Sequence, residues 1–502
     1  MKKIVIVGSG TAGLLAASMM NRYWEDRIQI TIIHDSNNKT IGVGESTTPV
    51  IHQVLQILRI DVKELVNKIG VTIKYGINFK DWIPDKEFFH GFEEINPYDG
   101  SSGILKKTHD HSSAYYGILN GKFNGGSHYN YPVTEVSSDD LRNMGTYALH
   151  IDTHAFCELL IHKLKDTNVK FIDDVVERVR VNQECNEISH IECKNSGVIN
   201  ADLFVDCSGF SSVLFKHLNP RWIDTSKSFP IDRAIPQQVQ NTSGEIPSYT
   251  LSQATQDGWI WQLPIGDRYG TGYLYSSKFT SDEQARATYN NWLLDNHGVT
   301  LDTDRIIKYR PGYYEDYWIG NCMVVGLSAG FIEPLESTSL HMLAFQIYMF
   351  LIFNSTLNNL EYTRRHVNNM NKVAYDSIFN FICFHYCTNR TDSEFWKYMT
   401  NNKTGWVKAI EEKCNKEFLD LSVFGNNKND SFSFDSYIQI GDGLNLFNRD
   451  SLREFLVAKP NGQEVLDTSE RLFVKEQIKR DKNRWVSHKE DLDRNKYLHG
   501  KQ

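Results

Sequence analysis

Two carboxylates and three hydroxyls are gathered in the stretch from Phe331 to Met342, where they could bind an anion or transfer a proton. They belong to Glu333, Glu336, Ser337, Thr338 and Ser339. The stretch follows an apolar run, residues 323–325, and a turn of small residues, and it leads into a largely apolar segment, residues 340–353. We therefore expect these polar side chains at a helix N-terminus, where unpaired backbone N–H groups favour anions. Taken alone, the pattern also fits an ordinary capped helix.

The elements that would position this chemistry begin with a nucleotide-binding pattern at the N-terminus. An apolar strand, Lys3 to Val7, enters the glycine turn GSGTAG, a helical run follows, and a second strand spans Ile28 to Ile33. In this context the glycines let the backbone approach a pyrophosphate at the helix N-terminus. The predicted cofactor-binding residues of the turn are Gly8, Gly10, Thr11, Ala12 and Gly13. A glycine turn without a ligand is the alternative.

Further cofactor candidates follow at strand ends and glycine turns. His34 ends the second strand, where an acid often holds ribose, and Asp35 is next to it. A loop of two glycines and three hydroxyls, GVGESTTP, could lie against a flat ring or a phosphate. These candidates are His34, Gly44, Glu45, Ser46, Asp206 and Gly326. No second GxGxxG is present for a separate nicotinamide cofactor.

Composition excludes several classes of protein. The 502 residues, 40% of them apolar and 23% charged, are typical of a soluble globular protein, and the length favours two or more modules. A net charge of −8 argues against nucleic acid as a partner, and no apolar run is long enough to span a membrane. The 8 cysteines lack a disulfide-framework spacing, so we expect a cytoplasmic protein with reduced thiols. We expect no metal site, because His150 and His154 have no third ligand nearby in the sequence.

A series of motifs along the chain resembles the flavin-dependent halogenases, whose best-known members are tryptophan halogenases. In order, they are GSGTAG, GVGESTTP, VTIKYGINFKDW, EFFHGF, DLFVDCSGF, GWIWQLP, FIEPLESTS and RTDSEFW. Together they cover about the first 400 residues. GWIWQLP matches the family signature WxWxIP with Leu263 in place of isoleucine, and the combination with a PLEST segment is far more specific than the glycine turn.

The resemblance implies FADH2- and O2-dependent halogenation of an electron-rich aromatic substrate. Hypohalous acid would form at the flavin and pass to Lys74, which aligns with the family's essential lysine. A desolvated amine can act as a nucleophile or polarise the halogen–oxygen bond. Glu336 aligns with the active-site glutamate, a candidate general base, and Thr338 and Ser339 with the halide site. Without the resemblance, a surface lysine and a helix N-terminal carboxylate are the simpler interpretations.

Four aromatic residues are implied at the substrate site and the tunnel. Trp259 and Trp261 would form a dry wall between flavin and substrate, and His90 and Phe92 would sandwich the aromatic ring. Packed core aromatics are the alternative for both pairs. The chain departs from the tryptophan halogenases at Ser339, where they carry glycine, which leaves the halide preference open. It also lacks their paired tyrosines in the C-terminal segment FSFDSY, which favours a phenol, indole or other arene over free tryptophan.

The implied architecture is α/β, a glutathione-reductase-type, Rossmann-like FAD-binding fold with additions. We expect the FAD-binding halogenase domain over residues 1–353, with an insertion at about 85–140 that faces the substrate. Residues 354–502 are expected to form a mainly helical C-terminal cap over the substrate site. The expected partners are the aromatic substrate, a separate flavin reductase that supplies FADH2, and further copies of the chain in a homo-oligomer.

Two other functions remain open at this point. An NAD(P)H-dependent aromatic monooxygenase on the same fold would reduce its flavin without a partner protein, and would not require Lys74 or the tryptophan pair. A non-catalytic flavin-binding protein would bind FAD without turnover. Retention of both Lys74 and Glu336 argues against the latter.

Overall fold

Two units make up the part of the chain that the structure describes. The computed structural model describes residues 1–37, 42, 44–92, 135–137, 147–357, 361–416, 431–432, 434–451, 454 and 485–487, with 135–137, 434–435 and 485–487 described by their backbone only. The first unit comprises Met1–Val71, His150–Arg233 and Ile306–Asp376, and the second comprises Thr72–Leu149, Ala234–Arg305 and Ser377–Gln502. Each unit is therefore formed by three separated segments of the sequence.

A six-stranded sheet in the order β21-β22-β13-β1-β2-β9 forms the centre of the first unit. Its strands are β1 (Lys2–Val7), β2 (Ile28–His34), β9 (Lys170–Asp173), β13 (Leu203–Asp206), β21 (Trp318–Ile319) and β22 (Cys322–Val324). All neighbours are parallel except the edge pair β21–β22. The apolar runs at Ile4–Val7 and Leu203–Asp206 are fully buried, as expected of parallel strands covered on both faces. The prediction of a mixed α/β fold with a parallel sheet is confirmed.

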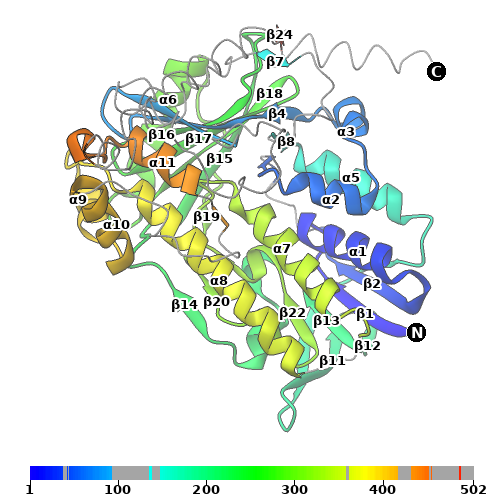
Figure 1. Ribbon diagram of the computed structural model, residues 1–502. Coiled ribbons are helices and arrows are strands. Elements are labelled where there is room, and N and C mark those ends of the chain that lie inside the picture. The colour runs from blue at the N-terminus through cyan, green and yellow to red at the C-terminus, as the bar shows by residue number, and fades with distance from the viewer. Residues whose placement is uncertain are drawn as a thin grey trace, which may run out of the picture. The chain divides into compact units, whose positions relative to one another are not determined.

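Helices pack against one another beside this sheet. They are α1 (Thr11–Trp24), α2 (Ile51–Leu58), α3 (Val62–Ile69), α5 (Thr153–Leu164) and α7 (Thr338–Phe353). α1 contacts α2, α5 and α7 as well as β1 and β2, and 10 of its 14 residues are buried (Figure 1). One smaller sheet of this unit contains β10 (Val176–Asn182), β11 (Glu187–Cys193) and β12 (Gly197–Ile199). Another contains β14 (Trp222–Asp224), β20 (Gly312–Tyr314) and β23 (Gly330–Phe331).

The second unit contains a largely antiparallel sheet. Six of its strands run in the order β15 (Arg233–Gln240), β18 (Arg268–Tyr275), β17 (Gly258–Ile265), β16 (Tyr249–Ala254), β5 (Gly76–Lys80) and β6 (Glu87–Gly91). The pairing of β16 with β5 is parallel, which joins the two hairpins β16–β17 and β5–β6 into one sheet. β4 (Thr72–Lys74) leads into this sheet through Tyr75, whose N–H donates to the Ser248 carbonyl at 2.7 Å.

Helices predominate in the C-terminal part of the described chain. They are α8 (Glu361–His385), α9 (Glu394–Asn401), α10 (Gly405–Lys416) and α11 (Phe434–Gly443), whereas α6 (Asp282–His297) follows the sheet and begins with a capping box at Ser281. α8 runs from the first unit into the second. The backbone strands β7 (Glu135–Ser137) and β24 (Trp485–Ser487) pair with each other, and β3 (Glu45–Ser46) pairs with β8 (Ala148–Ile151).

Two sequence-based expectations meet the limits of the described chain. Most of the insertion expected at about 85–140 lies outside the described residues, because only 85–92 and 135–137 are described there. The expected cap, residues 354–502, is described through α8 to α11 but hardly beyond residue 451. No helix among the described residues is long and apolar enough to cross a membrane.

Candidate active site

The predicted site residues are divided between the two units. The predicted cofactor and halide residues and Glu336 belong to the first unit, whereas Lys74 and the four aromatic residues belong to the second.

Gly8 and Gly13 hold the turn tightly against the sheet. A Cβ atom on Gly8 would lie 2.3 Å from the Cys207 carbonyl oxygen, and one on Gly13 would lie 1.9 Å from the Gly8 oxygen. Gly8 also has a φ of +111°, a backbone conformation that only glycine adopts readily. Its N–H donates to the Ile33 carbonyl at 2.8 Å, which ties the turn to β2. Both glycines are therefore required by the fold itself.

Gly10 differs, because a Cβ atom there would meet nothing within 4 Å. Gly10 caps the N-terminus of α1, where no side chain bonds the first-turn N–H groups and no acidic residue stands in the first turn. The positive end of the helix dipole is thus open beside a residue without a side chain. This arrangement fits the pyrophosphate of a dinucleotide such as FAD.

Glu45 and His341 are among the titratable groups of the first unit whose pKa values are shifted. Burial raises the pKa of Glu45, beside the turn, to about 7, and a hydrogen bond from the Thr11 hydroxyl partly offsets the shift. Burial lowers the pKa of His341 on α7 to about 4, so its ring is neutral near pH 7. His341 Nδ1 lies 3.1 Å from the Thr48 hydroxyl. The GVGESTTP loop is therefore tied to α7 near its N-terminus.

Two other predicted cofactor residues, His34 and Asp206, lie at the ends of β2 and β13, the two strands that flank β1 in the central sheet. His34 is half-buried at the end of β2, with its ring edge against Phe171 at 6.2 Å. Asp206 is 0% exposed at the end of β13. Its carboxylate accepts hydrogen bonds from the N–H and hydroxyl of Ser208 and from the N–H groups of Leu214 and Phe215, at 2.6–3.1 Å. Asp206 therefore shapes the glycine turn that follows it.

Gly326 brings the turn before α7 close to the nucleotide fingerprint. It has a φ of +65°, and a Cβ atom on it would lie 3.0 Å from the Cβ of Ala12. Its N–H donates to Gln346 Oε1 at 3.3 Å, and the Gln346 amide in turn donates to Asn371 on α8 at 3.0 Å. These buried polar groups hold the turn in the conformation that glycine permits.

The N-terminus of α7 carries the predicted halide residues. Ser337 precedes it at a φ of +59°, a left-handed conformation that costs a non-glycine residue of the order of 1 kcal/mol. The helix has no side-chain cap and no acidic residue in its first turn. Glu336 is 0% exposed, Thr338 is buried, and Ser339 is exposed. The helix end is therefore positive and has one accessible hydroxyl, which suits a small anion.

Lys74 ends β4 in the second unit and is 0% exposed, which excludes the surface position that lysines usually take. Its Nζ atom lies 4.8 Å from the centre of the Phe92 ring. Burial of an ammonium group is costly, and a cation over an aromatic face recovers part of that cost.

An aromatic wall continues from Phe92. The His90 ring lies 6.4 Å from Phe92, 5.6 Å from Phe381 and 6.5 Å from Phe432. Phe381 and Phe432 stack with their centres 4.0 Å apart. Phe432 belongs to the segment that departs from the tryptophan halogenases, whereas Phe381 was not predicted, because an apolar residue in a helix gives no sequence signal of its own.

Trp259 and Trp261 lie two residues apart on β17, so their side chains point to the same face of the sheet. Trp259 is 1% exposed, whereas Trp261 is half-buried. The Trp261 ring covers Gly272 on the neighbouring strand, where a Cβ atom would lie 2.0 Å from the ring. Only glycine at position 272 allows the indole to lie flat against β18.

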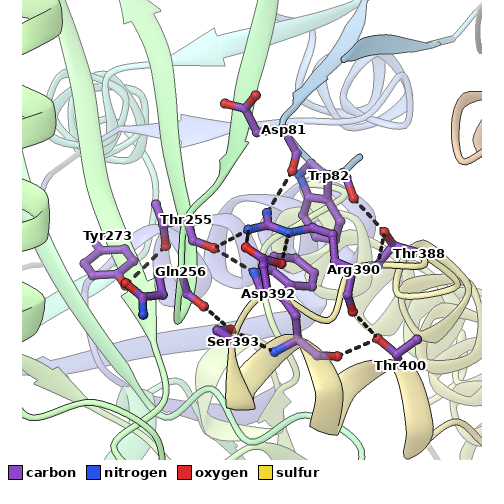
Figure 2. Close-up of polar contacts among 11 residues, drawn as sticks. Asp81, Trp82, Thr255, Gln256, Tyr273, Thr388, Arg390, Asp392, Ser393 and Thr400 are labelled. Carbon is purple, nitrogen blue, oxygen red and sulfur yellow. Dashed lines mark hydrogen bonds and ion pairs between the residues drawn. The ribbon is translucent and has the colours of Figure 1, made fainter. Parts of the chain in front are cut away.

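The motif RTDSEFW supports the hairpin that carries these tryptophans. Arg390 donates two hydrogen bonds to the Asp392 carboxylate, at 2.9 and 2.7 Å (Figure 2). It also donates to the backbone oxygens of Asp81, at 2.8 Å, and Thr255, at 3.4 Å. Its guanidinium lies over the Trp396 ring at 4.3 Å. The arginine side chain is 7% exposed and connects the β5–β6 turn with the end of β16.

Two more bonds complete the attachment of α9 to the β16–β17 turn. Trp396 Nε1 donates to the Thr255 oxygen at 2.7 Å, and the Ser393 hydroxyl donates to the Gln256 oxygen at 2.6 Å (Figure 2). Because Thr255 and Gln256 link β16 to β17, α9 fixes the start of the strand that bears Trp259 and Trp261.

Comparison with known proteins places this arrangement in a family. Residues 3–459 match the family described as tryptophan halogenase. Tryptophan 6-halogenase SttH from Streptomyces toxytricini is 30% identical over 422 residues, which span 79% of this chain and 80% of that protein. Tryptophan 7-halogenase RebH from Lentzea aerocolonigenes is 30% identical over 448 residues, 84% of this chain and 82% of its own.

Solved structures give the same result. The crystal structure of SttH covers 99% of this chain and 100% of its own with a TM-score of 0.84 and 26% identity. Tar14, a flavin-dependent tryptophan C-6 halogenase from taromycin biosynthesis, covers 99% of this chain and 100% of its own with a TM-score of 0.83 and 26% identity.

Proposed function

The chain belongs to the tryptophan halogenase family of flavin-dependent halogenases, and from this premise we propose that it halogenates an electron-rich aromatic compound other than free tryptophan. The enzyme is an oxidoreductase. The proposal assigns FAD, O2 and a halide ion as its cofactor and co-substrates, and a separate flavin reductase as the source of FADH2.

FAD is assigned to a glutathione-reductase-type site in the first unit. The open space at Gly10 and the uncapped N-terminus of α1 suit its pyrophosphate. Gly44, Glu45 and Ser46 would lie along the cofactor from the loop that Thr48 ties to α7. Bound as FADH2, the cofactor supplies the electrons that allow O2 to convert halide into hypohalous acid. Thr338 and Ser339 would hold the halide at the N-terminus of α7, chiefly through backbone N–H groups.

Lys74 is assigned as the residue that receives the hypohalous acid. Its buried amine can donate a hydrogen bond to the acid or, once deprotonated, carry the halogen as a haloamine. The position of its Nζ over Phe92 would present the electrophile to a substrate ring that packs against His90 and Phe92, whose own rings meet edge to face with their centres 6.4 Å apart. Glu336, a buried carboxylate, would accept the proton that the ring loses.

Trp259 and Trp261 are assigned as a dry wall that separates substrate from flavin. Such a wall favours halogenation over direct oxygen insertion, because the ring cannot reach the cofactor. The segment 354–502 is assigned as a mainly helical cap of the substrate site, supported by the contacts of Phe432 with the aromatic wall. We also propose that the protein forms a homo-oligomer.

The observation that carries the proposal is the fully buried Lys74, with its Nζ 4.8 Å from Phe92, in a chain of this family. The test is turnover with FAD, NADH, O2 and a flavin reductase against phenols and indoles, in chloride, bromide and iodide separately, analysed by mass spectrometry. A halogen mass shift supports the proposal. Oxygen insertion, or NADPH oxidation without the reductase, would instead indicate a monooxygenase.

A further inference from the structure

The edge of β6 beside the aromatic wall is closed by a side chain. β6 is the last strand of its sheet in the described chain, and one of its edges pairs with β5, with Ile77 opposite His90 and Gly76 opposite Gly91. An edge strand leaves the outward N–H and C=O of alternate residues without a strand partner.

Gln439 supplies that partner to Gly91. The Gly91 N–H donates to Gln439 Oε1 at 2.7 Å, and Gln439 Nε2 donates to the Gly91 carbonyl at 3.2 Å. A primary amide presents one acceptor and donors in the same plane, so it reproduces the two bonds of a neighbouring strand residue. Gln439 lies within α11 and is 2% exposed. A buried amide is retained at such a position only when its bonds are made.

The clamped residue lies between the two residues assigned to the substrate ring. His90 and Phe92 flank Gly91, the last residue of β6, and the centres of their rings lie 6.4 Å apart. On the other edge, the Phe92 N–H donates to the Tyr75 carbonyl at 2.9 Å, immediately after Lys74 in the chain. Gly91 and Phe92 are thus bonded on both edges, and the rotation of this short segment is fixed by Gln439 and Tyr75 together.

Ring orientation decides which carbon meets the electrophile in aromatic halogenation. A misplacement of about 1 Å in the residues that orient a substrate can change a rate by about a hundredfold. We propose that Gln439 is a positioning residue: by clamping Gly91, it sets the directions of His90 and Phe92 and thereby the regioselectivity of halogenation at Lys74. This inference rests on the proposed function.

Gln439→Leu tests it, because leucine fills a similar volume and makes neither hydrogen bond. Asn321→Leu is the matched control, since Asn321 clamps Ile188 in the first unit in the same way, at 2.8 and 2.9 Å. For the Gln439 variant we expect the ratio of regioisomers to fall about tenfold and KM to rise. Capture of hypohalous acid by the freely diffusing diketone monochlorodimedone should stay within about twofold of the parent, since the hydrogen bonds that the variant loses are those to Gly91.

Gln439→Glu tests positioning separately from a purely structural role, because it should make the regioselectivity depend on pH. A buried glutamate has a raised pKa, and its neutral form can accept from the Gly91 N–H and donate to the Gly91 carbonyl. Regioselectivity should therefore recover as the pH is lowered and be lost as the carboxyl ionises. An unchanged isomer ratio in both variants, or the same loss in Asn321→Leu, would overturn the proposal.

Hydrogen exchange separates this inference from the proposed function. In Gln439→Leu, the peptide that contains Gly91 should exchange faster than in the parent, whether or not any substrate is known. A parent enzyme that halogenates no compound, with faster exchange in the variant, would refute the proposed function but keep the clamp. Unchanged exchange at Gly91 would refute the clamp directly.

Discussion

Arg390→Met should destabilise the protein by about 3 kcal/mol, although Arg390 carries none of the proposed chemistry. The substitution keeps an unbranched side chain over Trp396 but removes the bonds to Asp392 and to the Asp81 and Thr255 oxygens. These contacts differ in what their loss costs, and three of them decide the magnitude.

The Asp392 carboxylate is 51% exposed, so water replaces the arginine there and the ion pair contributes about 1 kcal/mol. The Thr255 oxygen keeps its hydrogen bond from Trp396 Nε1, so the loss of its bond to Arg390 should destabilise the protein little. The Asp81 oxygen loses its 2.8 Å hydrogen bond and has no such second donor in the described chain, which should destabilise the protein by about 1–2 kcal/mol. Loss of the cation over the Trp396 indole should add about 1 kcal/mol of destabilisation. A fully buried pair would lose about 3–5 kcal/mol, so the exposure of Asp392 places the expected value at the low end.

Urea denaturation followed by tryptophan fluorescence measures the difference. Lys397→Ala is the control, because its ion pair with Glu394 is exposed on both sides and should be worth less than about 0.5 kcal/mol. Arg390 holds the pKa of Asp392 below its ordinary value, so the ion-pair part of the difference is present above pH of about 4 and disappears as the pH falls through the lowered pKa. A stability within about 0.5 kcal/mol of the parent at pH 7 would refute this reasoning.

The other predictions concern the first unit. Gly10→Ala should leave the stability of the FAD-free protein within about 0.5 kcal/mol, because its Cβ meets nothing, but weaken FAD binding about tenfold in calorimetric titration; unchanged affinity would place the pyrophosphate elsewhere. Because the pKa of His341 is lowered to about 4, the unfolded chain binds more protons below pH of about 6.5, and stability falls on acidification through this window. His341→Gln should flatten that loss in urea denaturation at stepped pH. The pKa of Glu45 is raised to about 7, so the folded chain holds the extra proton and stability falls as pH rises from 4.5 to about 7. Glu45→Gln should remove this slope, and a slope equal to the parent's would contradict the burial argument.

The sequence predicted the parts of the fold that depend on local pattern. The strands β1 and β2 and the helix α1 follow from an apolar β-branched run, a glycine turn and a helical run, all within about 35 residues. The need for glycine at Gly8 and Gly13 follows from the same turn, and the distances to Cys207 and Gly8 explain it. The start of α7 after Ser337 also agrees with the expected helix N-terminus.

Contacts between distant segments were beyond such reasoning. Nothing in the sequence distinguishes Phe381 from other apolar residues of a helix, yet it joins His90 and Phe432 in one wall. In the sequence, Gln439 is one polar residue on a helix expected in the cap. Its proposed role depends on hydrogen bonds to Gly91, which lies 348 positions away. Burial of Lys74 likewise depends on the neighbouring strands, because a lysine by itself is most often exposed.

If Lys74 transfers the halogen, Lys74→Met should abolish product formation, because methionine keeps the side-chain length in the buried site without its amine. Reduced FAD, O2 and bromide are mixed with each protein and an electron-rich arene; flavin oxidation is followed by absorbance, and the product by mass spectrometry. We expect the variant to bind FADH2 and to allow its oxidation by O2 at the parent's rate, while halogenated product falls by at least about a hundredfold. Product formation at the parent's rate would remove Lys74 from the reaction.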